Sequence, residues 1–317
     1  MLHSVEEFEK KVSTCSHCLD QKFAGLEGKR AIVLCGGTGC LSSHSHEIKE
    51  KFEQLIHEKG MENEVTVNHV GCFGFCSQGP FVKIYPEDTL YRLVKLEDVE
   101  EIFEKDILNH EVVERLLFVD PATHEKVAKQ DDINFYKKQV RIALHGCGKI
   151  NPEDINEALG EGAFQGLIRA LSMKREDVIK EVLDAGLRGR GGGGFPTGRK
   201  WQFAFAQDND EKYVVCNGDE GDPGAFMDRS ILEGNPLNVI EGMMIAGYAI
   251  GAKNGYFYVR AEYPIAVNRL RIAIQQAKEL GLLGENILGT GFSFDVHIRL
   301  GAGAFVWGEG NALFNSF

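Results

Sequence analysis

The chain has 317 residues, 43% of them hydrophobic and 26% charged, and a net charge of -12. This composition is typical of a soluble globular protein, and the length predicts two or three domains. The acidic balance argues against a nucleic-acid-binding surface. The N-terminal stretch MLHSVEEFEKKV lacks the apolar core of a signal peptide, and the apolar segment IEGMMIAGYAIGA is too short to span a bilayer. We therefore expect a cytoplasmic protein without a membrane-spanning segment.

Strand and helix patterns alternate in the first third of the chain. The predicted elements are a strand at 31–35, a helix at 42–60, strands at 64–70 and within 81–94, and a helix at 96–109. Their β-α-β-β-α order indicates a small α/β domain over residues 31–110. We expect residues 1–30 to be an N-terminal extension and residues 111–150 to be a linker.

A second and larger α/β domain is predicted over residues 151–317. Its predicted elements are helices at 153–159, 163–172 and 175–185, a strand at 212–216, a helix at 237–250, a strand at 256–260, a helix at 265–280 and a strand at 292–300. A glycine-rich loop separates the third helix from the first strand. The fold class is therefore α/β in both domains.

Four cysteines of the first domain form two closely spaced pairs. Cys35 and Cys40 are separated by GGTG, and Cys72 and Cys76 by FGF, and each pair follows a predicted strand. Glycines allow the backbone to wrap closely around converging thiolates, so these pairs favour a [2Fe–2S] cluster. Structural zinc more often uses the tighter C-x2-C spacing. Zinc binding and simple burial of the thiols are the alternatives.

The other thiols give weaker signals. Cys15 and Cys18 form CSHC, which resembles half of a zinc site, but no second half is evident. His17, His44 and His46 are candidates to complete such a site, but we expect them to be solvated polar residues. Cys147 and Cys216 are expected to be structural.

The segment from residue 186 to residue 201 reads GLRGRGGGGFPTGRKW and predicts a phosphate-binding loop. Its glycines allow close backbone approach and N–H donation, and its cations neutralise phosphate. Phe195 and Phe203 offer aromatic faces for stacking. A flexible linker is the alternative, but linkers rarely combine four cations with aromatic residues.

Two common nucleotide motifs fit this loop poorly. The loop contains G-x-G-x-x-G, which in a Rossmann fold follows a strand and precedes a helix. Here a helical pattern precedes the loop and Pro196 follows it, so the Rossmann interpretation is disfavoured. A phosphate-binding Walker loop requires Lys and then Ser or Thr after its last glycine, where this chain has Arg199.

An acidic turn follows the first strand of the second domain. Residues 216–229 read CNGDEGDPGAFMDR, and carboxylates at a strand's C-terminal end are well placed to bind ligands in α/β proteins. They accept hydrogen bonds from ribityl, ribose or nicotinamide groups. Alone, a solvated turn would be the better interpretation, but the neighbouring glycine loop favours a ligand site.

The cysteine motifs CGGTGC and VGCFGFCSQGP make residues 31–109 resemble the thioredoxin-like [2Fe–2S] ferredoxin module. The resemblance implies that all four paired cysteines bind the cluster. The glycine loop, the acidic turn, YFYVRAEYP and RLGAGAFVWGEG resemble the flavin- and NADH-binding subunit of complex I. They resemble most closely its relatives in NAD(P)-linked, often electron-bifurcating, iron-only hydrogenases and formate dehydrogenases, in which the ferredoxin module precedes the flavin domain.

This resemblance implies specific roles for residues of the second domain. The phosphate and isoalloxazine oxygens of FMN would be held by Gly189, Arg190, Gly191, Gly192 and Lys200. The flavin's polar edge and ribityl chain would contact Asn217, Asp219 and Glu220, while Glu220 would also lie near the nicotinamide as the residue closest to the chemistry. Phe195 and Phe203 would stack on the adenine of NAD(H) or NADP(H), and Asp222, Tyr258 and Glu262 would complete the site.

The chain departs from the family near its end. Where the family continues GAGAFVCGEETAL and then supplies cysteines for a [4Fe–4S] cluster, this chain reads GAGAFVWGEGNALFNSF and stops. We expect the flavin domain to be C-terminally truncated and the [4Fe–4S] ligands to be absent. Arg199 stands where the family often has Leu, and a cation there would favour the 2′-phosphate of NADP(H).

The resemblance implies an NAD(P)H-oxidising subunit that passes hydride to FMN and single electrons to iron–sulfur clusters. Hydrogenase is the preferred setting, with a formate dehydrogenase or complex I as alternatives. Expected partners are a hydrogenase or formate dehydrogenase catalytic subunit, a small [2Fe–2S] subunit and, as a further candidate, a ferredoxin. The competing hypothesis is a non-catalytic electron-relay or assembly module with a degenerate flavin domain.

Overall fold

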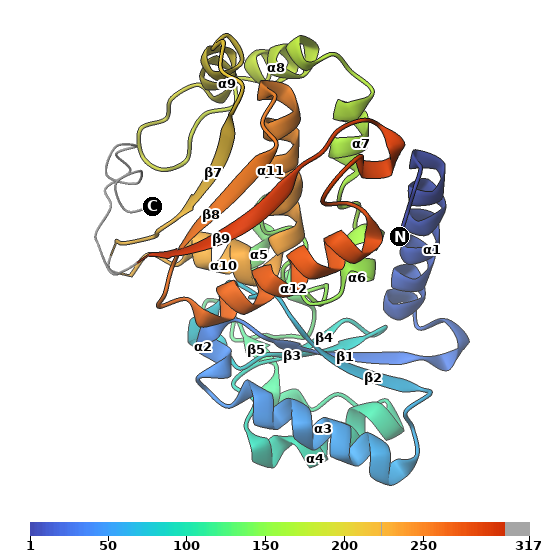
Figure 1. Cartoon of the computed structure of the whole chain (residues 1–317). Coiled ribbons are helices and arrows are strands. Elements are labelled where there is room, and N and C mark those ends of the chain that lie inside the picture. Colours follow the sequence, from blue (N-terminus) through green and yellow to red (C-terminus); the bar gives the residue numbers. More distant parts are fainter. Residues whose placement is uncertain (223, 302–317) are drawn as a thin grey trace. The chain divides into compact units, whose positions relative to one another are not determined.

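The structure is a computed structural model that describes residues 1–222 and 224–301 (Figure 1). The chain divides into two compact units. The ferredoxin unit comprises Thr14–Glu161 and Glu233–Asn235, and the flavin unit comprises Met1–Ser13, Gly162–Leu232 and Pro236–Phe317. Among the described helices, none combines the length and apolar character that a membrane crossing requires.

A four-stranded mixed sheet forms the centre of the ferredoxin unit. Its strands are β1 (Arg30–Cys35), β2 (Val65–Val70), β3 (Val82–Tyr85) and β4 (Thr89–Tyr91), in the order β2-β1-β3-β4. Strand β1 pairs in parallel with β2 and antiparallel with β3, and β3 pairs antiparallel with β4. The carboxyl ends of β1 and β2 therefore lie at one edge, and Cys35 is the last residue of β1.

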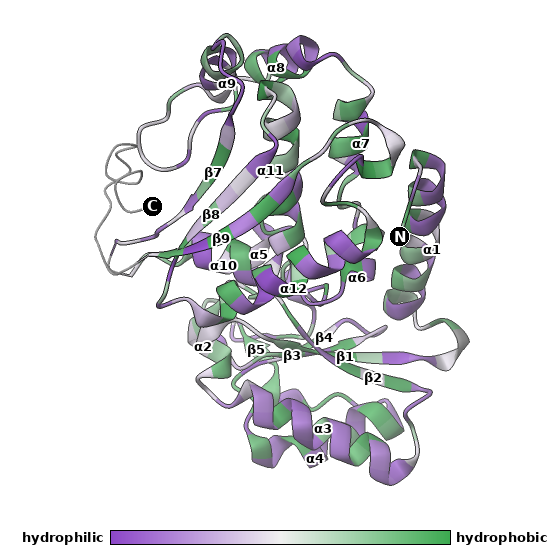
Figure 2. Ribbon diagram, viewed as in Figure 1, coloured by the Kyte–Doolittle hydropathy of each residue, from purple (hydrophilic) through white to green (hydrophobic). Residues whose placement is uncertain are grey.

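Strand β1 is buried on both faces, which its continuous apolar run predicts. Ile32 and Leu34 point to one face and pack with Phe52 of α3 (Ser45–Lys59), whereas Val33 and Cys35 belong to the core on the other face. Figure 2 shows both hydrophilic and hydrophobic residues along α3, as expected for a helix with one face in the core. The alternation along β1 thus delivers Cys35 to the face opposite α3.

Short helices and strands complete the ferredoxin unit. They are η1 (Leu26–Gly28), α2 (Thr38–Leu41), η2 (Cys76–Gln78), η3 (Leu96–Asp98), α4 (Val99–Ile102), η4 (Phe103–Leu108), η5 (Glu114–Leu116), β5 (Phe118–Val119), β6 (Lys126–Val127), η6 (Gln130–Asp132), α5 (Asn134–Lys137) and α6 (Ile155–Gly160). The predicted strands and helices between 31 and 109 are confirmed. The N-terminal extension contains a helix that the sequence analysis did not predict, α1 (Val5–Ala24), which has residues in both units.

Three parallel strands form the sheet of the flavin unit, in the order β7-β8-β9. They are β7 (Tyr213–Gly218), β8 (Asn254–Arg260) and β9 (Asp295–Gly301). The helices of this unit are α7 (Gln165–Leu171), α8 (Arg175–Asp184), α9 (Thr197–Phe205), α10 (Met227–Gly234), α11 (Pro236–Ile250) and α12 (Pro264–Leu280), and Ile287–Gly289 form a 3-10 turn, η7. The last two residues of α10, Glu233 and Gly234, belong to the ferredoxin unit. Helix α11 packs on β7 and β8, and Trp201 and Phe205 of α9 pack in a cluster with α7, α8 and α11.

A helix follows the glycine loop directly, contrary to the interpretation made from the sequence. Pro196 does not prevent a helix from following the glycine loop, because it is the N-cap residue of α9, which begins at Thr197. Proline is compatible with a helix start, since the first N–H groups of a helix have no partner inside the helix. What separates this loop from a Rossmann loop is the element before it, since α8 is a helix and not a strand.

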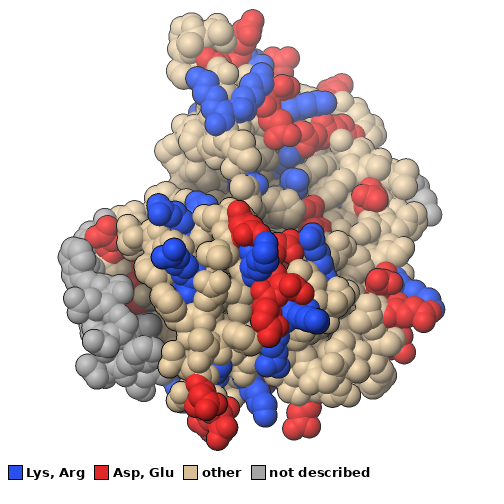
Figure 3. Space-filling model, turned by 90° about the horizontal axis from the view of Figure 1, so that it is seen from above, with Lys and Arg blue, Asp and Glu red and all other residues tan. Residues whose placement is uncertain are grey.

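Charged side chains of both signs are scattered over the face of the molecule seen from above, between larger uncharged areas (Figure 3). Figure 3 shows Lys and Arg side chains interspersed with Asp and Glu side chains across this face. The mixture agrees with a chain that has 47 acidic and 35 basic residues.

Candidate functional site

The four paired cysteines lie together at the carboxyl edge of the ferredoxin-unit sheet. Cys35 ends β1, Cys40 lies on α2, and Cys72 and Cys76 follow β2. The Cys35 thiol contacts those of Cys40 and Cys72, and the sulfur atoms of Cys72 and Cys76 are 3.9 Å apart. These contacts connect the four thiols, which we call the thiol row. Such a row of two pairs suits two irons that each bind two thiolates.

Glycines allow the loops to approach these thiols. A Cβ on Gly79 would lie 2.6 Å from the Cys40 sulfur, and a Cβ on Gly37 would lie 3.0 Å from the Cys72 Cβ. The backbone N–H of Gly74 donates to the Cys72 sulfur at 3.3 Å. Close backbone and N–H donation toward sulfur are the features that a thiolate-bound cluster requires.

Two of the four thiols have a raised pKa. The neighbouring Cys40 thiol and burial raise the pKa of Cys35 to about 12. The neighbouring Cys35 thiol and burial raise the pKa of Cys72 to about 11. Both groups are therefore protonated at neutral pH, and a bound metal must displace their protons. In the described part of the chain, no three His, Cys, Asp or Glu side chains converge on a single-ion site.

The remaining cysteines lie apart from this row. Cys15 is buried on α1, where its thiol donates to Asn156 at 3.8 Å, and Cys18 is exposed one turn later. Cys147 is buried in the ferredoxin unit. Burial raises the pKa of Cys216, on β7, to about 12. These positions agree with the structural roles expected for Cys147 and Cys216.

The glycine loop connects α8 to α9 and is closed at its base by the backbone. The Gly189 N–H donates to the Phe195 carbonyl at 2.9 Å, and the Thr197 N–H donates to the Leu187 carbonyl at 2.9 Å. Between these bonds, a Cβ on Gly191 would meet no atom within 4 Å. The tip of the loop is thus open to a ligand, and its backbone N–H groups remain available for phosphate.

The tip also requires glycine for conformational reasons at two positions. Gly192 has a φ of +97° and Gly194 a φ of +58°, values that L-residues rarely adopt. The charged side chains of Arg190 and Lys200 are exposed on the loop and on α9. The loop therefore combines accessible backbone N–H groups with exposed cations, as its sequence predicts.

Two phenylalanines lie beside this loop. The rings of Phe195 and Phe203 have centroids 6.5 Å apart at an angle of 44°, and the side chains are 51% and 60% exposed. Exposure of two adjacent aromatic rings costs free energy unless a ligand or partner covers them. The predicted adenine-stacking residues are thus together and accessible.

A buried carboxylate lies where the strands of the flavin unit end. Asp219 follows β7, and its Oδ2 atom is buried without a hydrogen-bond partner among the described residues. A Cβ on Gly301, the last residue of β9, would lie 3.3 Å both from Asp219 Oδ1 and from the hydroxyl of Tyr258. The three residues meet at the carboxyl edge of a parallel sheet, a common ligand-binding position. An unpartnered acceptor there is suited to a hydroxyl or amide donor of a ligand.

Glu220 has a structural contact that the sequence analysis did not foresee. Its carboxylate accepts hydrogen bonds from the backbone N–H groups of Asp228 and Arg229, each at 3.1 Å, at the start of α10. The hydroxyl of Tyr263 donates to the same carboxylate at 3.2 Å. Glu220 therefore caps α10 and links it to the acidic turn. Its predicted position near the nicotinamide stays a prediction.

The remaining predicted residues of the acidic turn and its surroundings are accessible. Asn217 is exposed and its Oδ1 accepts the Asp219 N–H at 3.0 Å. Asp222 is exposed at the turn, and Glu262 is exposed and pairs with Arg260 at 3.5 Å. Trp307, Gly310 and Asn311, on which the predicted loss of the [4Fe–4S] site rests, lie outside the described residues.

Two parts of the chain match known protein families. Residues 23–106 match the thioredoxin-like [2Fe–2S] ferredoxin family, and residues 182–317 match the Nuo51 FMN-binding domain. The chain carries a [2Fe–2S] ferredoxin domain and an FMN-binding domain. The predicted fold classes and the family resemblance are thereby confirmed, and the zinc alternative for the four cysteines is set aside.

Two curated relatives each align with a little more than half of the chain. The chain is 55% identical over 180 residues to the NADP-reducing hydrogenase subunit HndC of Solidesulfovibrio fructosivorans, covering 57% of this chain and 36% of that protein. It is 49% identical over 177 residues to an NADH-quinone oxidoreductase subunit of Aquifex aeolicus, covering 56% of this chain and 41% of that protein. The aligned part is thus about two fifths of each relative's length.

The solved structures include an NAD+-reducing [NiFe]-hydrogenase in its H2-reduced state. Its likeness covers 97% of this chain and 48% of that chain, with a TM-score of 0.45 and 22% sequence identity.

The residues of both domains fit the groups that the families bind. In the ferredoxin domain, four adjacent thiols lie among glycines and accept a backbone N–H bond. In the FMN-binding domain, the open glycine loop can receive a phosphate, and the unpartnered Asp219 oxygen can accept from a hydroxyl-bearing chain. The donor sets thus match the chemistry of a [2Fe–2S] cluster and of FMN.

The cluster loop has an anchor that the sequence analysis missed. Glu233 is buried within the ferredoxin unit, and its carboxylate accepts hydrogen bonds from the Thr38 backbone N–H, at 3.1 Å, and from the Thr38 hydroxyl. Thr38 lies between Cys35 and Cys40. Because 195 positions separate the two partners, no local pattern in the sequence could have revealed the contact.

We expect this anchor to stabilise the cluster loop. The variants Glu233→Ala and Thr38→Val and the double variant should give a coupling free energy of unfolding of about 1–3 kcal/mol, because Thr38→Val removes the hydroxyl donor to the buried carboxylate and leaves only the backbone N–H. Urea unfolding of the four proteins measures it. Thr38→Ser, which keeps both donors, should unfold like the wild type, and additive single effects would show that the contact contributes nothing.

Two glycines near the loop should respond oppositely to substitution. A Cβ on Gly198 would lie 2.6 Å from the Leu183 Cα, so Gly198→Ala should separate α8 from α9 and cost about 1–3 kcal/mol of unfolding free energy. Gly191→Ala meets open space and should leave the stability of the FMN-free protein unchanged. It should nevertheless weaken FMN binding, because a methyl group then stands where a phosphate approaches. Thermal unfolding and FMN titration of both variants distinguish the two effects.

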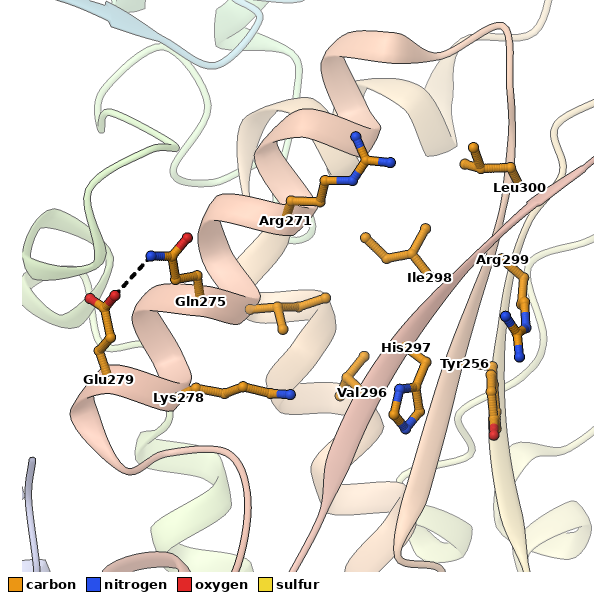
Figure 4. Close-up of a pocket in the computed structure, with 11 residues that line it drawn as sticks. Tyr256, Arg271, Gln275, Lys278, Glu279, Val296, His297, Ile298, Arg299 and Leu300 are labelled. Carbon is orange, nitrogen blue, oxygen red and sulfur yellow. Dashed lines mark hydrogen bonds between the residues drawn. The ribbon is translucent and has the colours of Figure 1, made fainter.

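A hollow of about 760 Å³ lies between α12 and strands β8 and β9, apart from the predicted sites (Figure 4). It is lined by Arg271 and Lys278 of α12 and by Arg299 of β9, among others, and Gln275 donates to Glu279 across one helical turn at 2.9 Å. None of its lining residues was among the predicted site residues.

Proposed function

We propose that the chain is the NAD(P)H-oxidising flavoprotein subunit of a multi-subunit oxidoreductase, with an NAD(P)-linked hydrogenase as its preferred setting. The domains and relatives support an oxidoreductase subunit of the hydrogenase or NADH dehydrogenase type. The proposal adds diaphorase activity, that is, electron transfer from NAD(P)H to an acceptor. The observation that carries it is the unpartnered Asp219 carboxylate oxygen in a domain that also has an open glycine loop.

When bound, FMN exchanges electron pairs with a nicotinamide and single electrons with iron–sulfur clusters. The chain's own residues would bind and orient the reactants. Asp219 would accept a hydrogen bond from the ribityl chain, and the loop N–H groups with Arg190 and Lys200 would neutralise the phosphate. Phe195 and Phe203, exposed side by side, would cover the adenine of the nucleotide. No general acid or base is needed for a hydride transfer between stacked rings.

Partners and location follow as parts of the same proposal. A hydrogenase or formate dehydrogenase catalytic subunit and a small [2Fe–2S] subunit would exchange electrons with this chain, and a ferredoxin is a further candidate. All eight cysteines lie within the described residues and none forms a disulfide, which supports a reducing compartment such as the cytoplasm.

Anaerobic spectroscopy tests the proposal. The purified chain, reconstituted with iron, sulfide and FMN, should show flavin and cluster absorption, and NADH or NADPH should bleach the flavin band. Arg199, exposed on α9, is the residue to exchange for Leu if NADPH proves the better reductant. A chain that holds iron but no FMN would support the relay module with a degenerate flavin domain, and a chain that binds FMN without reduction by either nucleotide would refute the diaphorase activity.

A further inference from the structure

A cavity of about 440 Å³ in the ferredoxin unit is not used by the proposed electron transfer. It is lined by β3, by the turn that follows β3 and by side chains of the segment 130–149. This segment belongs to the predicted linker, to which the sequence analysis gave no role. The cavity adjoins the core that contains the cluster thiols, because Tyr136 belongs to both.

Two polar atoms on the lining of this cavity are buried without a hydrogen-bond partner among the described residues. They are the hydroxyl of Tyr136, a residue that is 6% exposed, and the Nη2 atom of Arg141. Both residues line this cavity. A guanidinium nitrogen can only donate, and a phenol at neutral pH carries a proton to donate. Both atoms therefore require an acceptor that the described residues do not supply.

The two residues that flank Arg141 are apolar and exposed, whereas Arg141 itself lines the cavity. Val140 is 90% exposed and Ile142 is 81% exposed, while Arg141 between them lines the cavity. Hydrophobic burial alone would favour the opposite arrangement. The segment is thus organised around the inward position of a cation.

The other buried or half-buried cations of the cavity already have partners. Lys83 pairs with Asp88 at 2.5 Å and donates to Gln130 at 3.2 Å. His145 pairs with Glu161 at 2.6 Å. Asp131 and Lys149 lie exposed at the rim. Among the described lining residues, Arg141 thus supplies the buried cationic nitrogen that has no hydrogen-bond partner.

We propose that this cavity binds a small oxyanion, a carboxylate or phosphate, through the guanidinium of Arg141 and the hydroxyl of Tyr136. A planar guanidinium matches two oxygens of such an anion, and the Tyr136 hydroxyl adds a third donor. The anion satisfies both unpartnered atoms and balances the buried charge. Its site is separate from the FMN phosphate loop, which lies in the other unit.

Thermal unfolding of the full chain tests the proposal. Protein saturated with FMN, so that the flavin site is occupied, is melted in potassium phosphate, potassium acetate or potassium chloride at equal ionic strength. We expect phosphate or acetate at ten times its Kd to raise Tm by about 3 °C relative to chloride. The more effective of the two anions identifies the ligand as phosphate or carboxylate. A chain without FMN serves equally, because the Arg141 variant assigns the shift to the cavity.

Three variants assign the effect. Arg141→Gln should abolish the anion-dependent shift and raise Tm in chloride, since the unpaired buried cation is gone. Tyr136→Phe should weaken binding about tenfold, which corresponds to one lost hydrogen bond. It removes a single oxygen and so provides the test if Arg141→Gln does not fold. Lys149→Gln at the exposed rim should respond like the wild type. An equal shift in chloride, or wild-type responses from Arg141→Gln and Tyr136→Phe, would overturn the proposal.

Discussion

Replacing Cys35 or Cys72 with alanine should abolish cluster binding while leaving FMN binding intact. Each of these two thiols contacts two other thiols of the four. Alanine removes a thiolate ligand and offers no other donor atom, so one iron of the cluster loses a ligand. After anaerobic reconstitution, the iron content should fall from about two atoms per chain to nearly none. Iron analysis and the visible spectrum measure the loss.

Two other cysteines provide matched controls for this experiment. Cys18 is exposed on α1 and Cys216 lies on β7, in the other unit. Cys18→Ala and Cys216→Ala should each retain the full iron content. Normal iron in the Cys35 and Cys72 variants, or its loss in the Cys18 variant, would contradict the assignment and reopen the question of a metal site on α1.

Replacing Asp219 with asparagine should lower FMN affinity about 10- to 150-fold. The substitution keeps the shape of the side chain but replaces a carboxylate acceptor, and bonds to charged groups contribute about 1.5–3 kcal/mol. It should also leave the FMN-free protein as stable as the wild type or more stable, because an unpartnered buried carboxylate oxygen is removed. Flavin-fluorescence titration and thermal unfolding give the two quantities.

The control for Asp219 is an acid of the same type outside the turn. Asp208 is exposed before β7, and Asp208→Asn should change neither FMN affinity nor stability. If Asp219→Asn binds FMN as tightly as the wild type, the carboxylate does not face the flavin. If it loses stability and affinity together, Asp219 has a structural role instead.

The sequence was most informative where short-range patterns determine structure. The run AIVLC predicted β1 because both faces of that strand are buried, and the cysteine spacing placed two pairs at strand ends. The glycine loop was recognised because open backbone and cations are local properties. These features need only neighbouring residues to form, so they are visible without the fold.

Long-range contacts and local compensation were not visible in the same way. Pro196 was interpreted as an argument against a following helix, whereas it caps one. Glu220 was predicted from the acidic turn alone, yet its carboxylate also caps α10, eight residues later. The contact between Thr38 and Glu233 and the inward side chain of Arg141 depend on how distant segments pack. Such contacts are set by the tertiary structure and leave no periodic signal.

The closed base of the glycine loop has a consequence for how this protein can evolve. Two backbone hydrogen bonds join residues 187–189 to residues 195–197, while side chains added at Gly191 or Gly193 would touch nothing. Substitutions at these tip positions can therefore alter ligand preference without disturbing the packing of α8 and α9. Selection can therefore change ligand specificity there with little effect on folding. At Gly198, only a few residues away, any side chain would collide with α8.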